Sequence, residues 1–466
     1  MGKGGSRMAR KMVQFRDPDL SLWQSAVDQV VSKAKAQGPA LDIGGHAPAS
    51  RPDPGDSMVA AAADLATEVD ETKQIPDAVR VTTAAEGFVD QAKFCSTTAF
   101  RLAKAKLMGN SAEAVRLREE LTVALGPCDP KWADVVAIYV ANKALGHDIP
   151  YRRFKQLGDF VIDGVLKEDA RVALIGDWGT GDTGAKLLLR QIAAKKPDAV
   201  IHVGDVYYSG TEHEFQNYFY NIWQPTLGIQ KVNWGDKLNT STTPITFTLA
   251  GNHDMYSGGQ PYYTTIDMLG QPSSYFCLRN ENWQFIALDT GLHDSNPVDQ
   301  EPTFLEDQEV AWLKDKIATA GRRKTVLLSH HQLFSAIDDI GAKGNRINQK
   351  LLGQLKDILP QVEVWFWGHE HNLVIYGNYQ GVLGRCIGHG AFPVDVDEGI
   401  KQDPNVPVAK VALSPAGDKA LYQHGYVLMD LKPNNATVTY YQFDAESQDE
   451  EELHSEVIGA GAAGAD

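Results

Sequence analysis

Short polar motifs follow apolar stretches at five places in this 466-residue chain. One of them, Gly204-Asp205-Val206-Tyr207-Tyr208, comes directly after the apolar run 199–203. If that run is a strand, its end presents a carboxylate and then a phenol, which together can bind metal ions. Asp205 can give one oxygen to each of two cations, and Tyr208 can bind one of them as a phenolate.

Four other stretches offer metal ligands at the corresponding place, after a strand-like run. They are Gly176-Asp177-Trp178-Gly179, Gly251-Asn252-His253-Asp254, Ser329-His330-His331 and Gly368-His369-Glu370-His371. Ligands gather outside the carboxyl ends of the strands in open α/β sheets, so we expect the five motifs to converge. Taken singly, each motif has an ordinary structural explanation: Asp177 and Asp205 can cap helices, and Tyr208 can be a packed aromatic.

The elements that must position these motifs form an α/β pattern, with sheet strands buried on both faces. The expected strands are Arg171–Ile175, Asp198–Val203, Ile245–Ala250, Gln284–Leu288, Lys324–Leu328 and Val362–Trp367, with His424–Asp430 and Ala436–Phe443 as a closing pair. The expected helices between them are Asp182–Lys196, Phe304–Ala320 and Asn348–Leu359.

Four segments are expected along the chain. Residues 1–58 are predicted to be a basic arm, an amphipathic helix and a linker, and residues 59–165 a helical accessory domain that can bind a protein partner. Residues 166–445 would form the catalytic domain. Residues 446–466, acidic and then rich in Gly and Ala, are predicted to be disordered.

The composition is that of a soluble globular protein, with 43% apolar and 22% charged residues. A net charge of −16 argues against nucleic acid as a partner. No apolar run approaches the roughly 18 to 20 residues that span a bilayer, and no secretory signal is visible, so we expect a cytoplasmic protein. The four cysteines are too scattered for a disulfide framework or a thiolate zinc site.

The order of the five motifs resembles the calcineurin-like metallophosphoesterase family, whose motifs run DxH or DxG, GDxxD or GDxxY, GNH(D/E), a lone H, and GHxH. Gly179 in the first motif and Tyr208 in the second resemble the purple acid phosphatase branch, whose tyrosinate binds ferric iron. The resemblance covers residues 171–393. It implies a core of two packed β-sheets flanked by helices, and hydrolysis of a small-molecule phosphoric ester.

The resemblance also implies two metal ions. Asp177, Asp205, Tyr208 and His371 would hold the first, and Asp205, Asn252, His330 and His369 the second, with Asp205 bridging. A metal-bound hydroxide would attack phosphorus. His253 would act as general acid or steady the transition state, and Asp254 would orient His253.

The metal pair is predicted from charge. Fe(III) with a divalent ion (Fe, Zn or Mn) is favoured, because a phenol ionises near pH 10 unless a strong cation binds it. Two divalent ions are the alternative. Next to His330, His331 is a second imidazole that can ligate.

Three other functions are weighed against a phosphomonoesterase. The same site can serve a phosphodiesterase or nucleotide hydrolase. Residues 179–184 match GxGxxG with Asp205 about twenty residues on, which is the pattern of a dinucleotide-binding oxidoreductase. A non-catalytic interaction protein is the third, although every expected ligand is present.

Overall fold

The structure is a computed structural model. It describes residues 149–459 except 230–232, 237–243, 295–301, 397–399, 401–402, 412 and 416–420, together with Ser21, Gln24, Ser25, Asp28 and Arg116. Residues 149–466 belong to one compact unit and residues 12–148 to another. The predicted arm, linker and accessory domain therefore lie outside the described residues up to residue 148, apart from those single residues, which are helical.

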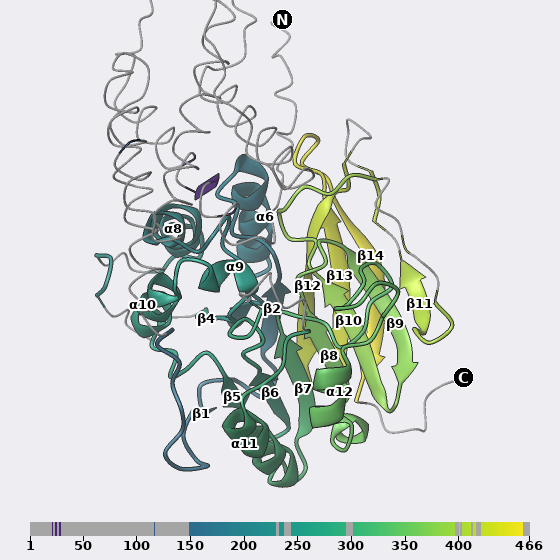
Figure 1. Cartoon of the computed structure of the whole chain (residues 1–466). Helices are drawn as coiled ribbons and strands as arrows, with labels where there is room; N and C mark the ends of the chain where they lie inside the picture. Colours follow the sequence, from purple (N-terminus) through teal and green to yellow (C-terminus); the bar gives the residue numbers. More distant parts are fainter. Residues whose placement is uncertain are drawn as a thin grey trace, which may run out of the picture. The chain divides into compact units, whose positions relative to one another are not determined.

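Two sheets form the centre of the unit that begins at Ile149 (Figure 1). Among the described residues, the larger sheet has the order β1-β5-β6-β7-β8-β10-β9-β11 and the smaller has the order β14-β13-β12-β2-β3-β4. The strands of the larger sheet are β1 (Val161–Asp163), β5 (Phe276–Arg279), β6 (Trp283–Ala287), β7 (Lys324–Ser329), β8 (Val364–Trp367), β10 (Val382–Ile387), β9 (Leu373–Tyr379) and β11 (Val408–Val411). Those of the smaller sheet are β14 (Glu450–Ile458), β13 (Ala436–Phe443), β12 (His424–Leu431), β2 (Arg171–Ile175), β3 (Ala199–His202) and β4 (Ile245–Thr248).

The two sheets pack against each other across one apolar core. Alternate residues of β2 point to opposite faces, so that Val172 and Leu174 enter the core between the sheets while Ala173 packs under the helices. From the larger sheet, Phe285 and Val326 enter the same core. Burial on both faces explains why these strands are continuously apolar in the sequence.

Helices pack on the outer face of each sheet (Figure 1). Those between β2 and β5 are α6 (Thr183–Ala194), α7 (Glu212–Glu214), the π-helix η1 (Phe215–Tyr220), α8 (Asn221–Thr226), α9 (Asn252–Met255) and α10 (Gln260–Leu269). Those between β6 and β8 are α11 (Asp307–Ala318), α12 (Gln349–Leu355) and the 3₁₀ helix η2 (Leu359–Gln361). Leu188 of α6 and Val200 of β3 belong to one buried apolar cluster, and Trp312 of α11 and Leu327 of β7 belong to another. The predicted two-sheet α/β core flanked by helices is confirmed.

The predicted boundary between an accessory domain and the catalytic domain, at residue 165, is wrong. Strand β1 pairs parallel with β5, and the compact unit begins at Ile149. The segment is held from several sides: the Tyr151 hydroxyl donates to Glu309 Oε2 at 2.8 Å, and Trp312 Nε1 donates to the Asp159 carbonyl at 2.9 Å. These partners are distant in sequence, so local patterns could not reveal them.

The predicted disordered tail is also wrong over residues 450–458, which form strand β14 and pair antiparallel with β13. Arg385 Nη2 lies 2.6 Å from Glu456 Oε2, and Lys195 forms an ion pair with Glu450. The acids that suggested disorder therefore have cationic partners or face solvent, while main-chain bonds join the strand to the sheet. Residues 460–466 lie outside the described part.

Within the described residues, none of the helices combines the length and the apolar character that crossing a membrane requires.

Candidate metal centre

The topology brings the five motifs to one place. β2, β3 and β4 are parallel neighbours, and each leads directly into one motif, at Asp177, Asp205 and Asn252. In the other sheet β7 and β8 are parallel neighbours that lead into His330 and His369. Parallel strands end on the same side of a sheet, and the packing of the two sheets sets these ends against each other.

Three site residues have left-handed backbone conformations, although none is a glycine. The φ angle is 53° at Asp177, 73° at Asp205 and 66° at His369. Such angles are uncommon outside glycine and concentrate at functional sites, where the surrounding structure holds them. They turn the chain sharply after each strand.

Glycines next to the site leave space for its carboxylates. A Cβ atom on Gly251 would lie 2.1 Å from Asp205 Oδ1, and one on Gly368 would lie 2.5 Å from Asp177 Oδ2. Both distances are far below van der Waals contact. Gly251 and Gly368 are therefore needed so that a neighbouring carboxylate can approach the backbone.

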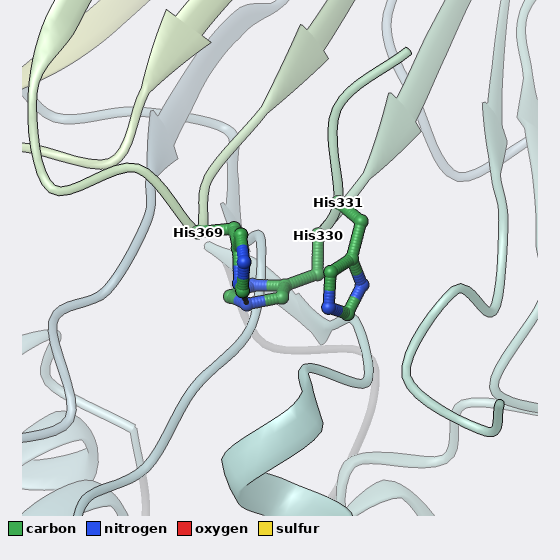
Figure 2. A group of neighbouring side chains, drawn as sticks. All are labelled: His330, His331 and His369. Atoms are coloured by element: carbon green, nitrogen blue, oxygen red, sulfur yellow. Dashed lines mark hydrogen bonds between the residues drawn. The ribbon is translucent and has the colours of Figure 1, made fainter. Parts of the chain in front are cut away.

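Asn252, His330 and His369 form a first donor group. Asn252 Oδ1 lies 3.1 Å from His330 Nε2 and 3.2 Å from His369 Nδ1, and the two nitrogens are 3.3 Å apart. Figure 2 shows these two imidazoles meeting at the ends of their strands. Ligand bonds of about 2.1 Å place neighbouring ligands about 3.0 Å apart in an octahedron and about 3.4 Å apart in a tetrahedron. The observed separations fall in this interval.

Asp177 and His371 belong to a second donor group, with Asp205 beside them. Asp177 Oδ1 lies 3.4 Å from His371 Nε2. Single ligand atoms of Asp177, Asp205 and His371 lie within 4.8 Å of one another. Asp205 also borders the first group, because its Oδ2 is 3.3 Å from His330 Nε2.

The tautomer of His330 directs its second nitrogen to the site. His330 Nδ1 lies 3.0 Å from the carbonyl oxygen of Val203, which can only accept, so Nδ1 carries a proton. Nε2 is then the nitrogen that faces Asn252 and Asp205. Fixing a ligating imidazole in this way through its other nitrogen is typical of metal sites.

Electrostatics favour positive charge between the two groups. Burial raises the pKa of Asp205, but the imidazoles of His330 and His253 outweigh burial and hold it well below its usual range. Burial lowers the pKa of His330, whereas Asp205 raises it more strongly, to about 9. Asp205 Oδ2 is buried and forms an ion pair with His330 Nε2 at 3.3 Å. Donor chemistry, spacing and charge therefore fit two bound cations.

His331 lies close to His330 and His369, and one ligand atom from each lies within 4.8 Å of the others. Its ring nitrogens have other partners, however: Nδ1 is 3.1 Å from Thr290 Oγ1, and Nε2 is 2.8 Å from Asp294 Oδ2. Both partners of His331 lie outside the two donor groups, whereas Nε2 of His330 faces Asn252 and Asp205, which are themselves candidate ligands. His330 is the better ligand.

Exchanging each imidazole for an amide tests that choice. We expect His330→Gln to weaken retention of one metal by more than about 100-fold and His331→Gln to leave it within a few-fold of wild type. Competition with a chromogenic chelator measures both. A larger loss in His331→Gln than in His330→Gln would reverse the assignment.

His253 and Asp254 lie in α9, directly after Asn252. His253 is fully buried, and its Nδ1 donates to the carbonyl oxygen of Tyr208. Burial lowers the pKa of His253, against the opposing effect of Asp205. The ring therefore has its Nδ1 proton fixed, and Nε2 is its second functional atom.

Asp254 accepts hydrogen bonds from three backbone N–H groups. Its Oδ2 accepts from the backbone N–H of Gly251 at 2.8 Å and of Asp205 at 3.0 Å, and its Oδ1 accepts from that of Val206 at 2.9 Å. Burial and the charge of Asp205 raise the pKa of Asp254 to about 8. Its described bonds join the loops after β3 and β4. The prediction that it orients His253 stays a prediction.

The tyrosine that reaches the site in the structure is Tyr207, a residue that sequence reasoning passed over. Tyr207 Oη lies 2.9 Å from Asp177 Oδ1 and 2.8 Å from His371 Nε2. The Tyr208 backbone N–H donates to Glu214, and its carbonyl oxygen accepts from His253. The spacing of the motif pointed to Tyr208, but spacing does not show which of the two rings turns toward Asp177.

The GxGxxG stretch has a local role. A Cβ atom on Gly179 would lie 2.6 Å from Val206 Cα, so this loop packs directly on the loop of Asp205. Asp182 caps α6 by accepting from Ala185 N at 2.7 Å. Asp205, the acid that a dinucleotide ribose would need, lies beside His330 instead.

His202 and His389 are two further buried histidines. His202 of β3 is fully buried, with Nδ1 3.0 Å from Thr248 Oγ1. Burial lowers its pKa to about 4, which keeps it neutral in the core. Burial likewise lowers the pKa of His389 to about 4.

Comparisons with known proteins agree with this geometry at the level of the family. Residues 170–373 match the family model described as calcineurin-like phosphoesterase. No curated protein matches the chain.

Several solved structures are similar in fold. A dimetal phosphatase from Danio rerio, LOC 393393, is 13% identical, with a TM-score of 0.39, over 63% of this chain and 99% of that one. A single mutant of Vps29 from Entamoeba histolytica is 11% identical, with a TM-score of 0.27, over 61% of this chain and 98% of that one. Vps29 from Chaetomium thermophilum is 9% identical, with a TM-score of 0.27, over 62% and 97%.

Proposed function

We propose that this chain, whose residues 170–373 form a calcineurin-like phosphoesterase domain, hydrolyses phosphoric esters with the help of two metal ions. The observation that carries the proposal is the pair of adjacent donor groups with Asp205 bordering both. Asn252, His330 and His369 would hold one ion, and Asp177 and His371 the other. Asp205 would bridge them.

The ions, when bound, would bind the phosphate oxygens and activate a water molecule as nucleophile. The chain positions the ligands. Asp177, Asp205 and His369 are buried and have left-handed backbone conformations, which orient their side chains without an ion. We place Fe(III) with a divalent ion first and two divalent ions second. A donor set of carboxylate, amide, imidazole and phenol suits Fe, Zn and Mn better than Ca or Mg.

We assign to His253 the transfer of a proton from Nε2 to the leaving oxygen of the ester. Its Nδ1 proton is engaged by the Tyr208 carbonyl, so Nε2 must first take up a second proton from solvent, and the imidazolium then gives that proton to the leaving oxygen. Asp254 is a positioning residue, because it ties the loop of His253 to the loop of Asp205 through three backbone N–H groups.

Phosphomonoesters are the substrate class we place first, with phosphodiesters second. The donors Asp177, Asp205, Asn252 and His330 are 0% exposed, and His369 is 5% exposed. A terminal phosphate can project into so deep a site more readily than a phosphate flanked by two substituents. Burial therefore supports the monoester.

The test is a metal-dependence assay on the full-length protein. Metal content is measured, a chelator removes the ions, and Fe, Zn and Mn are added back singly and in pairs. Hydrolysis of p-nitrophenyl phosphate and bis-p-nitrophenyl phosphate is followed throughout. We expect activity to vanish with the metal, return with it and favour the monoester.

Two outcomes would overturn parts of this proposal. Faster hydrolysis of the diester would move the substrate class to phosphodiesters. A protein that holds two ions yet hydrolyses neither ester would remove the hydrolase function. NAD binding by a metal-free chain would instead support the oxidoreductase.

A further inference from the structure

We propose that Glu370, which stands between the two histidines of the last motif, is a positioning residue for the metal centre. Its side chain binds Ser335 and so holds the loop after β8 (residues 368–372) against the loop after β7 (residues 330–348). The inference rests on the proposed function, since it assumes that His369 and His371 bind the ions. It adds that a hydrogen-bond acceptor at position 370 determines how tightly the ions are held.

The first observation is that these two loops carry ligands for both ions. His330 Nε2 and His369 Nδ1 lie 3.3 Å apart, one from each loop, at the ends of neighbouring strands (Figure 2). His371, in the same loop as His369, belongs to the other donor group. A shift of the loop after β8 relative to the loop after β7 would therefore change the geometry at both ions.

The second observation is that the hydroxyl of Ser335 is fully used. Ser335 Oγ accepts from the backbone N–H of Ile337 at 2.8 Å and of Asp338 at 2.7 Å, and it donates to Glu370 Oε1. A hydroxyl has two lone pairs and one proton, so its proton requires an acceptor once both lone pairs are bonded. Ser335 is 0% exposed and Glu370 2% exposed, so the bond between them is buried. Removing either partner leaves the other polar group unpaired in the interior, which is costly.

The third observation is that the backbone of Glu370 is held as well. Its N–H donates to the Gly368 carbonyl at 2.8 Å, and its carbonyl oxygen accepts from Cys386 Sγ at 3.2 Å. A Cβ atom on Gly388 would lie 2.4 Å from the same carbonyl oxygen, so the chain after β10 packs directly on this loop. With the backbone fixed at β10 and the side chain fixed at Ser335, the imidazoles on either side of Glu370 have little freedom to move.

An ordinary structural role is the alternative, in which the bond only anchors the loop after β7. A second bond to that loop separates the two explanations. The Tyr376 hydroxyl accepts from Ala336 N at 3.0 Å and joins the loop to β9, outside the ligand loop. If anchoring alone mattered, losing either bond would have the same effect. If Glu370 positions the ligands, only its own bond affects metal binding.

Five full-length variants test the inference. Glu370→Ala and Ser335→Ala each remove one partner of the bond, and the double variant removes both. Glu370→Gln keeps an acceptor oxygen, and Tyr376→Phe is the matched control. Wild type and variants are loaded with zinc and, separately, with manganese. Chelator competition gives the stoichiometry and the affinity for each ion, and thermal unfolding of the metal-free proteins shows that each is folded.

We expect Glu370→Ala and Ser335→Ala each to lose about 10–100-fold in metal affinity, as replacements of groups that orient ligands do. The double variant should be no weaker than the weaker single variant, because both changes remove the same bond. Glu370→Gln should stay within a few-fold of wild type. Tyr376→Phe should unfold at a lower temperature than wild type yet keep its metal affinity within a few-fold.

Three outcomes would overturn the inference: wild-type affinity in Glu370→Ala and Ser335→Ala, an equal loss in Tyr376→Phe, or a loss in Glu370→Gln as large as in Glu370→Ala. If Glu370→Ala does not fold, Ser335→Ala decides, because it leaves the carboxylate in place. Failure of the proposed function looks different. Wild type would then hold its ions without hydrolysing either ester, and the affinities of the variants would still decide the role of Glu370.

Discussion

Replacing Asp205 by asparagine is expected to remove both metal ions and to lower turnover of p-nitrophenyl phosphate by at least about a thousand-fold. Asp205 borders both donor groups, with Oδ2 3.3 Å from His330 Nε2. Its Oδ1 accepts from the His253 backbone N–H at 3.1 Å, so it also holds the loop of the proton donor. Asparagine keeps the size of the side chain but removes the negative charge that two cations would share.

A matched control lies at the other end of the same strand. Asp198 comes directly before β3, where its Oδ2 accepts from Arg171 N at 3.0 Å, whereas Asp205 follows the strand. Asp198→Asn should change stability slightly and leave metal content and turnover near wild type. If Asp205→Asn kept two ions and wild-type activity, the bridging role would be wrong.

The convergence of the motifs could be predicted because it depends on strand order rather than on loops. An apolar run followed by glycine and a polar residue shows where a buried strand ends, as at Ile175 and His202. Parallel strands then place those ends side by side without further information. The strand predicted at 171–175 is β2 itself, and the helix predicted at 182–196 contains α6.

The choice between Tyr207 and Tyr208 could not be predicted, because it is made by the backbone after the strand. Asp205 has a φ angle of 73°, so the chain no longer alternates its side chains as a strand does. Which ring then faces Asp177 depends on where Glu214 and His253 anchor the Tyr208 backbone. Both anchors lie outside the motif.

The edge strands β14 and β1 were not predicted, and the reason is again that they depend on residues outside the local sequence. β14 begins with three consecutive glutamates, and β1 is only three residues long. Each is stabilised by pairing with a strand far away in the sequence, β13 for the former and β5 for the latter. A local sequence pattern indicates which residues are buried and where the chain turns. It does not indicate that the edge of a sheet, formed by residues far away in the sequence, is available for pairing.

The second large effect is expected for His253→Ala, which should keep both ions and slow hydrolysis by about 10² to 10⁴-fold for an alkyl phosphate. His253 donates Nδ1–H to the Tyr208 carbonyl, and in our proposal Nε2 gives a proton to the leaving oxygen. An alkoxide needs that proton far more than p-nitrophenolate, which leaves as a stable anion. The loss should therefore be much smaller for p-nitrophenyl phosphate.

The comparison of the two leaving groups separates proton donation from general damage to the site. His331→Gln is the control, because it alters an imidazole beside the same centre whose nitrogens are bonded to Thr290 and Asp294. Any loss in that variant should be equal for both esters. A loss in His253→Ala that is also equal for both would mean that the ring steadies the transition state without giving up a proton.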